Sequence, residues 1–224
     1  MSKQEVVHSE PFILASGSKI RKKILLDHGI QFGVQTSKVD EEKLKKNILD
    51  LPFEERVIKL ASAKAKQISE LNLERYVVGA DQMCVCNGRV FNKPGNLENS
   101  INNLRLLAGN THCQYSGISI FLNGKSLWTF CDKATLTMKK LSDEEIISYV
   151  LEDEPYECCG SYKYESLGAT LFSKVKGSEY SIQGLAFDPL MNAFKKFGIF
   201  FWEKVLSIGL NRSFRSFNRK QDLP

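Results

Sequence analysis

The sequence is short of the residues that mark several common classes of protein. It has only three histidines and no Cys-x2-Cys pair, and of its six cysteines only Cys113 has a histidine beside it. We therefore expect no zinc site, and we expect the thiols to stay reduced. No apolar run reaches the roughly 18 residues that a membrane helix needs, and no apolar leader is apparent. The expectation is a cytoplasmic protein with no membrane segment.

A strong excess of charge is also lacking. The 224 residues carry 31 basic and 26 acidic side chains, for a net charge of +5, whereas a dedicated nucleic-acid binder gathers basic residues on one face. Hydrophobic residues make up 42% and charged ones 25%, which is ordinary for a globular protein that buries a sizeable core. We expect a flexible N-terminus over residues 1–10, a folded domain over 11–200 and a basic extension over 201–224.

The stretch from Val77 to Pro94 carries the clearest local signal in the chain. Asn87-Gly88 lies between two β-prone runs, and this dipeptide favours a type I′ hairpin turn because both positions need positive φ. Asp81 is expected near the start of the first hairpin strand, and Lys93 follows the second. A carboxylate and a lysine placed in this way suit an anionic ligand with a metal. The alternative is a surface acid and a solvated lysine.

A second signal lies near the N-terminus, where residues 12–15 predict a short buried strand. Ser18 is a natural N-cap for the helix that follows, and Gly29 is a natural residue to end it. A strand, a small-residue turn and a helix N-terminus point free backbone N–H groups at an anion. Arg21 lies in the first turn among three lysines, where cations oppose the helix dipole. A bound polyphosphate explains this cluster, and a solvated basic turn is the alternative.

Two further charged groups belong to the next segments. Residues 34–39 are expected to form a strand that ends in Asp40-Glu41-Glu42, and such carboxylates can hold a hard cation. Pro52 opens a predicted helix in which Lys64 shares the inward stripe of Leu60 and Ile68. Such a lysine either extends its ammonium to the surface or places a charge in a cleft.

The remaining segments mix helices and strands without strict alternation, which predicts an α/β fold with a mixed, partly antiparallel sheet flanked by helices. We expect helices over 97–107, from a capping box at Ser142 and from Asp188 to Gly198; strands over 111–122 and 126–138 around an Asn123-Gly124 turn; and strands carrying a loop over 160–177.

Seven short motifs occur in an order that resembles the Maf family of nucleoside triphosphate pyrophosphatases, over residues 11–198. They are ILASGSKIR at 13–21, VDE at 39–41, LASAKA at 60–65, VGADQ at 78–82, NKP at 92–94, TH..YSG at 111–117 and GSYKYESLG at 160–168. The resemblance implies a Maf/ITPase-like fold with two lobes around a cleft, and often a homodimer. It also implies hydrolysis of a nucleotide substrate to the monophosphate and pyrophosphate, with Mg²⁺ or Mn²⁺ as cofactor.

The resemblance also implies roles for individual residues. Asp81 matches the catalytic acid, and Glu41 matches an acid linked to the metal, so the expected metal ligands are Glu41 and Asp81. The expected phosphate-binding residues are Ser18, Arg21, Lys64 and Lys93.

Three positions bear on the base that is recognised. Gln82 and Glu165 match the branch of the family that acts on 7-methyl-GTP, whereas Ile20 stands where that branch has an aromatic residue. Lys19 and Ser166 also depart from its pattern. A dTTP/UTP pyrophosphatase of the same family is the alternative substrate class. Two further alternatives are a non-catalytic nucleotide-binding regulator of cell division and an RNA-binding protein that uses the basic extension.

Overall fold

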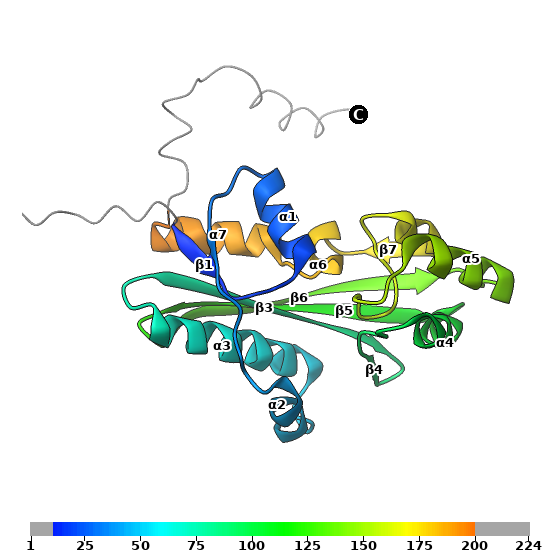
Figure 1. Ribbon diagram of the computed structural model, residues 1–224, viewed down its shortest axis with the longest axis horizontal. Coiled ribbons are helices and arrows are strands. Elements are labelled where there is room, and N and C mark those ends of the chain that lie inside the picture. Colours follow the sequence, from blue (N-terminus) through cyan, green and yellow to red (C-terminus); the bar gives the residue numbers. More distant parts are fainter. Residues whose placement is uncertain (1–10, 200–224) are drawn as a thin grey trace, which may run out of the picture.

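A mixed seven-stranded sheet forms the centre of the computed structural model, which describes residues 11–199 (Figure 1). The strand order is β2-β1-β3-β5-β6-β7, with β4 paired to β3 outside this path. β1 runs parallel to β2 and β3, and the other pairs are antiparallel. The strands are β1 Phe12–Leu14, β2 Gly33–Val34, β3 Tyr76–Cys86, β4 Arg89–Phe91, β5 Thr111–Leu122, β6 Lys125–Met138 and β7 Phe172–Lys176. The predicted mixed, partly antiparallel sheet is confirmed.

Helices cover both faces of this sheet. α3 lies along one face with α2 beside it, α1, α6 and α7 lie on the opposite face, and α4 and α5 lie at the far end (Figure 1). The helices are α1 Lys19–Asp27, α2 Glu41–Asn47, α3 Phe53–Leu71, α4 Leu97–Leu107, α5 Asp143–Asp153, α6 Glu179–Ile182 and α7 Phe187–Phe197, with a 3-10 helix at Leu167–Leu171. Within residues 11–199, no helix combines the length and apolarity that crossing a membrane requires.

The local signals of the sequence agree with the structure at both tight turns. Asn87 and Gly88 have φ of 50° and 76°, and Asn123 and Gly124 have φ of 52° and 71°. Positive φ at both central residues is what the predicted type I′ turns require. The capping box is also confirmed, because the Ser142 hydroxyl accepts from Glu145 N and the Glu145 carboxylate accepts from Ser142 N.

Other predictions were wrong in extent. The strand expected over 34–39 is limited to Gly33–Val34, because Asp40 caps α2 and the chain leaves the sheet edge before it. Of residues 160–177, only Phe172–Lys176 forms a strand, and the preceding segment is irregular apart from the 3-10 helix. The short helix α6 was not predicted. The expected flexible segment 1–10 and basic extension 201–224 lie outside the described residues.

The sheet face toward α1 and α7 carries two apolar clusters with polar side chains between them. Val78, Ala80, Ile118 and Ile120 pack with α1 and α7, while Cys84 and Cys86, further along the same face of β3, pack with α4 and α5. Gln82 lies between the two clusters, directly across from Ser116 of β5. The core of this face is therefore divided beside the middle of β3.

Candidate active site

The candidate site lies along a segment of β3 that has an open edge. β1 pairs with β3 only as far as Val78, whose carbonyl accepts from Ala15 N, and β4 pairs with β3 only from Cys84 onward. Residues 79–83 therefore have no strand neighbour on this edge within the described part of the chain. The gap begins where β1 ends and α1 starts. Crevices outside the carboxyl ends of parallel strands are where open α/β sheets bind ligands.

The N-terminus of α1 lies at this gap, and it begins at the N-cap that the sequence predicted. Ser18 is the N-cap, and its hydroxyl accepts from Arg21 N at 3.4 Å. The first turn contains no acidic residue that would neutralise the helix dipole. Free N–H groups and a positive dipole end are therefore available to an anion. Ile20 is partly buried against the apolar cluster that contains Val78 and Ile118.

Arg21 is turned into the gap and held there by the protein. Its Nε donates to Gly184 O at 2.7 Å, and its Nη1 donates to Ser16 Oγ and Ala80 O, each at 3.0 Å. Only 8% of the residue is exposed. Burial lowers the pKa of the guanidinium, and the Asp81 carboxylate is the largest influence against that decrease. These hydrogen bonds use Nε and Nη1, so Nη2 is the nitrogen left to contact a phosphate.

Lys64 of α3 joins the two predicted metal ligands. Its Nζ lies 2.7 Å from Asp81 Oδ1 and 3.0 Å from Glu41 Oε1. The Lys64 and Asp81 side chains are each only 12% exposed, whereas Glu41 at the start of α2 is 40% exposed. The structure thus brings together three residues from three elements, and Lys64 places its charge inside the fold instead of extending it into solvent.

Two glycines allow α3 to lie close enough to the sheet for this contact. A Cβ on Gly79 would lie 2.1 Å from Ala61 O, and one on Gly117 would lie 2.6 Å from Val57 O. Gly117 pairs directly with Asp81 across β3 and β5. Any larger side chain at either position would push α3, and Lys64 with it, away from Asp81.

Asp81 and Glu41 are too few ligands to hold a divalent cation unless a substrate supplies the others. Residues 11–199 contain no cluster of three or more side chains of the types that ligate metals. Asp81 and Glu41 nevertheless both contact the Lys64 ammonium group, so the two carboxylates are close enough to share a metal cation as well. Mg²⁺ is commonly held by one or two carboxylates plus substrate phosphates. The two carboxylates therefore suit a metal that arrives bound to a triphosphate.

Lys93 lies further out than the sequence suggested. The hairpin pairs only Cys84–Cys86 with Arg89–Phe91, so Asp81 is in the middle of β3, before the hairpin begins. Lys93 follows β4, its side chain is 65% exposed, and its Nζ lies 3.3 Å from Glu157 Oε2. It belongs to the rim of the site and not to the Asp81 cluster.

The residues expected to select the base lie on the sheet face opposite the one that Lys64 contacts. Gln82 Nε2 donates to Ile182 O at 2.6 Å and to Ser181 O at 3.3 Å. Glu165 is exposed. Burial raises the pKa of the Cys158 thiol to about 12, and the negative charge of Glu165 contributes to this increase. Lys163, two residues before Glu165, directs its Nζ to the backbone carbonyl of Asp153.

Cys159 is the residue at this site that sequence reasoning missed. Burial raises the pKa of its thiol to about 11; the Asp81 carboxylate adds to the increase, while Arg21 and Lys93 oppose it. The charges of three predicted site residues therefore converge on one side chain. No local pattern could identify it, since Cys158-Cys159 precedes an irregular segment far along the chain.

Comparison with known proteins agrees with this geometry. The family model described as Maf-like protein matches residues 11–197. A nucleoside triphosphate pyrophosphatase of Legionella pneumophila is 41% identical over 187 residues, which are 84% of this chain and 94% of that protein. A protein of the same name from Nitrobacter hamburgensis is 35% identical over 85% of this chain and 95% of its own. A dTTP/UTP pyrophosphatase of Bacillus cereus is 32% identical over 88% and 95%, respectively. The chain belongs to the Maf family.

Proposed function

We propose that the protein hydrolyses a nucleoside triphosphate to the monophosphate and pyrophosphate, with Mg²⁺ or Mn²⁺. The observation that carries this proposal is the contact of Lys64 with both Asp81 and Glu41, at 2.7 and 3.0 Å, beside Arg21 and the N-terminus of α1. Relatives named nucleoside triphosphate pyrophosphatases over nearly their whole length support the same activity.

The cations in and around the gap match the charge of the substrate. A triphosphate carries roughly four negative charges, and a helix N-terminus with lysine and arginine side chains can offset them. Arg21 offers Nη2, Ser18 caps the helix N-terminus, and Lys93 supplies an exposed charge at the rim. Positioning and charge stabilisation are the main requirements of phosphoryl chemistry, which needs little covalent participation by the protein.

Asp81 is the group suited to accept the proton of the attacking water. The hydrogen bond from Lys64 uses Oδ1 and leaves Oδ2 as the oxygen that can take the proton. Lys64 also fixes the carboxylate in one orientation. A divalent ion held by Asp81 and Glu41 would supply positive charge at the phosphate oxygens.

The proposed substrate is a guanine-type nucleotide, with 7-methyl-GTP as the leading candidate. Guanine offers two adjacent donors, N1–H and the exocyclic amine, and the Glu165 carboxylate can accept both. Uracil and thymine offer one N–H between two carbonyls, so one carbonyl would face the acid unpaired. A carbonyl left unpaired when the base binds costs about 1–3 kcal/mol of binding free energy, which corresponds to roughly 5- to 150-fold discrimination between the bases. The Bacillus cereus relative is named for dTTP and UTP, and that substrate class is the competing proposal.

A screen of nucleoside triphosphates for pyrophosphate release with Mg²⁺ tests the proposal. We expect pyrophosphate, not orthophosphate, and the highest kcat/KM for 7-methyl-GTP. No pyrophosphate from any nucleotide would contradict the activity. Glu165→Gln should shift the ratio of kcat/KM for 7-methyl-GTP and UTP toward UTP, while Glu152→Gln, an exposed glutamate on α5, should leave the ratio unchanged. An unchanged ratio in Glu165→Gln would remove Glu165 from the base pocket.

A further inference from the structure

The side-chain amide of Gln82 forms hydrogen bonds within the protein through both its nitrogen and its oxygen. Its Nε2 donates to the carbonyls of Ile182 and Ser181, at 2.6 and 3.3 Å. Its Oε1 accepts from Cys159 Sγ at 3.2 Å. Both N–H donors of this amide are therefore directed to carbonyls of the protein, and Gln82 has no donor left to offer a base. Gln82 instead links α6 to the segment that carries Cys159, and both lie on the same face of β3.

The two carbonyls fix which way the amide points. If the amide were turned over, Oε1 would face two carbonyl oxygens and all three groups would lack a donor. Nε2 must therefore face α6, and Oε1 must face Cys159. A donor is needed at that position, and the Cys159 thiol is the group that supplies it.

The segment that carries Cys159 lies tightly against β3. Gly160 has φ of +82°, and a Cβ there would lie 2.9 Å from Cys84 Sγ, so the backbone itself packs on the strand. Ser161 Oγ accepts from Asn103 Nδ2 at 3.0 Å, and Tyr162 OH accepts from Gln114 Nε2 at 2.7 Å. These contacts fix the segment toward α4 and β5. The Cys159 contact fixes it next to Asp81.

We propose that Cys159 is a positioning residue: its thiol holds the Gln82 amide, and through Gln82 it locks residues 159–165, which end in Glu165, against α6 beside Asp81. This inference rests on the proposed function, because it assigns the locked segment to the base pocket. It gives Gln82 an indirect part in base selection, through the segment that it holds and not through contact with the base.

Three variants separate the hydrogen bond from the bulk of the side chain. Cys159→Ala removes the donor, Cys159→Ser keeps a donor, and Cys158→Ala removes a neighbouring thiol for which no side-chain hydrogen bond is found among the described residues. Steady-state kinetics with 7-methyl-GTP and amide hydrogen exchange of residues 159–165 and 181–184 are measured for each, alongside the wild type. The exchange measurement needs no substrate, so it tests the contact independently of the activity.

Loss of the donor leaves a partly buried acceptor without its partner, so we expect Cys159→Ala to speed exchange in both segments and to raise KM, each by roughly 5-fold or more, with kcat changed less. Cys159→Ser and Cys158→Ala should remain within about twofold of the wild type. Exchange in Cys159→Ala equal to that in Cys158→Ala would overturn the inference, as would a serine variant as impaired as the alanine variant. If the wild type hydrolysed no nucleotide, the proposed function would fail, and the exchange data would still decide whether Cys159 locks the segment.

Discussion

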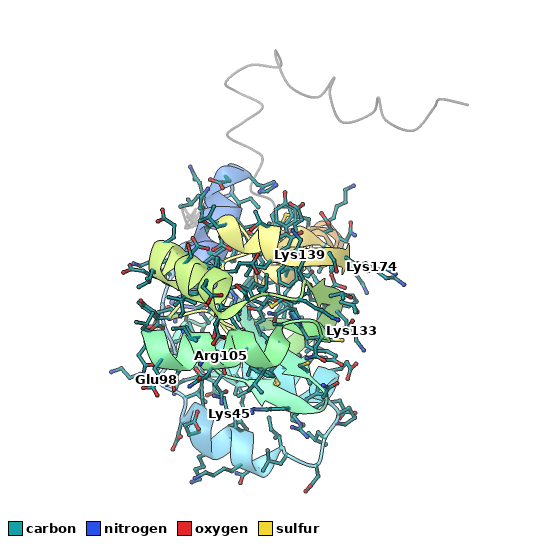
Figure 2. The ribbon with its side chains drawn as sticks, turned by 90° about the vertical axis from the view of Figure 1, so that its right-hand side faces the viewer. Lys45, Glu98, Arg105, Lys133, Lys139 and Lys174 are labelled. Atoms are coloured by element: carbon teal, nitrogen blue, oxygen red, sulfur yellow. The ribbon has the colours of Figure 1, made fainter. Side chains whose placement is uncertain are left out.

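Two contacts between a basic and an acidic side chain in this molecule differ in how far they are exposed to solvent. Lys64 meets Asp81 and Glu41 between α3, α2 and β3, where the Lys64 and Asp81 side chains are each 12% exposed. Arg105 of α4 meets Asp143 of α5 at the end of the molecule seen in Figure 2, where the side chains are 45% and 59% exposed. Arg105 makes the better-shaped contact, with Nε and Nη2 donating to both carboxylate oxygens at 2.9 and 2.8 Å.

We expect burial to matter more than the geometry of the pair. Water can replace either partner of Arg105 and Asp143, so the contact contributes little despite its two hydrogen bonds. At Lys64 water is largely excluded, and electrostatic interactions there are stronger because the effective dielectric constant is lower. The buried cluster is suited to chemistry on an anion, and the surface pair is suited to none.

The largest effect is expected from Asp81→Asn. Asparagine has nearly the same shape but is neither a base nor an anionic metal ligand, so activity should decrease at least roughly 100-fold. Asp143→Asn makes the same chemical change in the surface pair and should leave kcat/KM unchanged. Both proteins should give native circular dichroism. Near-wild-type turnover by purified Asp81→Asn would contradict the mechanism.

Arg21→Ala should have the next largest effect. It leaves the buried carbonyls of Gly184 and Ala80 without their donor, which costs about 1–3 kcal/mol per unpaired group, and it removes the proposed phosphate contact. We expect at least a roughly tenfold loss of kcat/KM, and Arg21→Lys should not restore it because lysine lacks the planar fork. Lys23→Ala, on the exposed face of α1, is the control. Equal, small and salt-screened effects in all three variants would mean that α1 carries only a solvated basic surface.

The sequence predicted features that depend on residues close together in the chain, and it missed contacts between distant segments. The Asn87-Gly88 turn, the Ser18 cap and the Ser142 capping box depend on neighbours within a few residues, and the sequence predicted each of them. Lys64 was a partial success, because its place on the stripe of Leu60 and Ile68 indicated an inward charge but not its partners. Contacts between Cys159 and Gln82, or between Arg21 and Gly184, join distant segments that no local periodicity connects.

His112, buried on β5 against the rings of Tyr162 and Phe172, should make stability depend on pH. Burial lowers its pKa to about 4, and Nδ1 has no hydrogen-bond partner in the described structure. The unfolded chain takes up this proton near pH 6.5 and the folded chain only near pH 4, so the unfolded state binds more protons in between. Stability should therefore decrease as pH falls through this window, by about 2 kcal/mol from pH 7.5 to 5. Urea unfolding at both pH values measures the difference.

A His112→Gln variant is the control for this pH effect. Glutamine does not titrate, so the difference in the free energy of unfolding between the two pH values should shrink by most of that amount, whatever the substitution does to stability at pH 7.5. An unchanged difference would show that other groups cause the acid sensitivity.

The smallest effect is expected at the surface pair itself. Arg105→Ala should shift the melting temperature by no more than about 2 °C at moderate salt and should leave kcat/KM unchanged. Differential scanning calorimetry measures the shift. A large loss of stability would mean that exposure does not weaken this contact, and the comparison with Lys64 would not hold.

The most direct test of the proposed chemistry is the position of the bond that water breaks. Hydrolysis of the preferred nucleotide in water enriched in heavy oxygen, followed by mass spectrometry of both products, reports which phosphorus was attacked. If water activated at Asp81 attacks the α-phosphorus, the heavy oxygen appears in the nucleoside monophosphate and the pyrophosphate remains unlabelled. Heavy oxygen in the pyrophosphate, or release of labelled orthophosphate, would contradict the account.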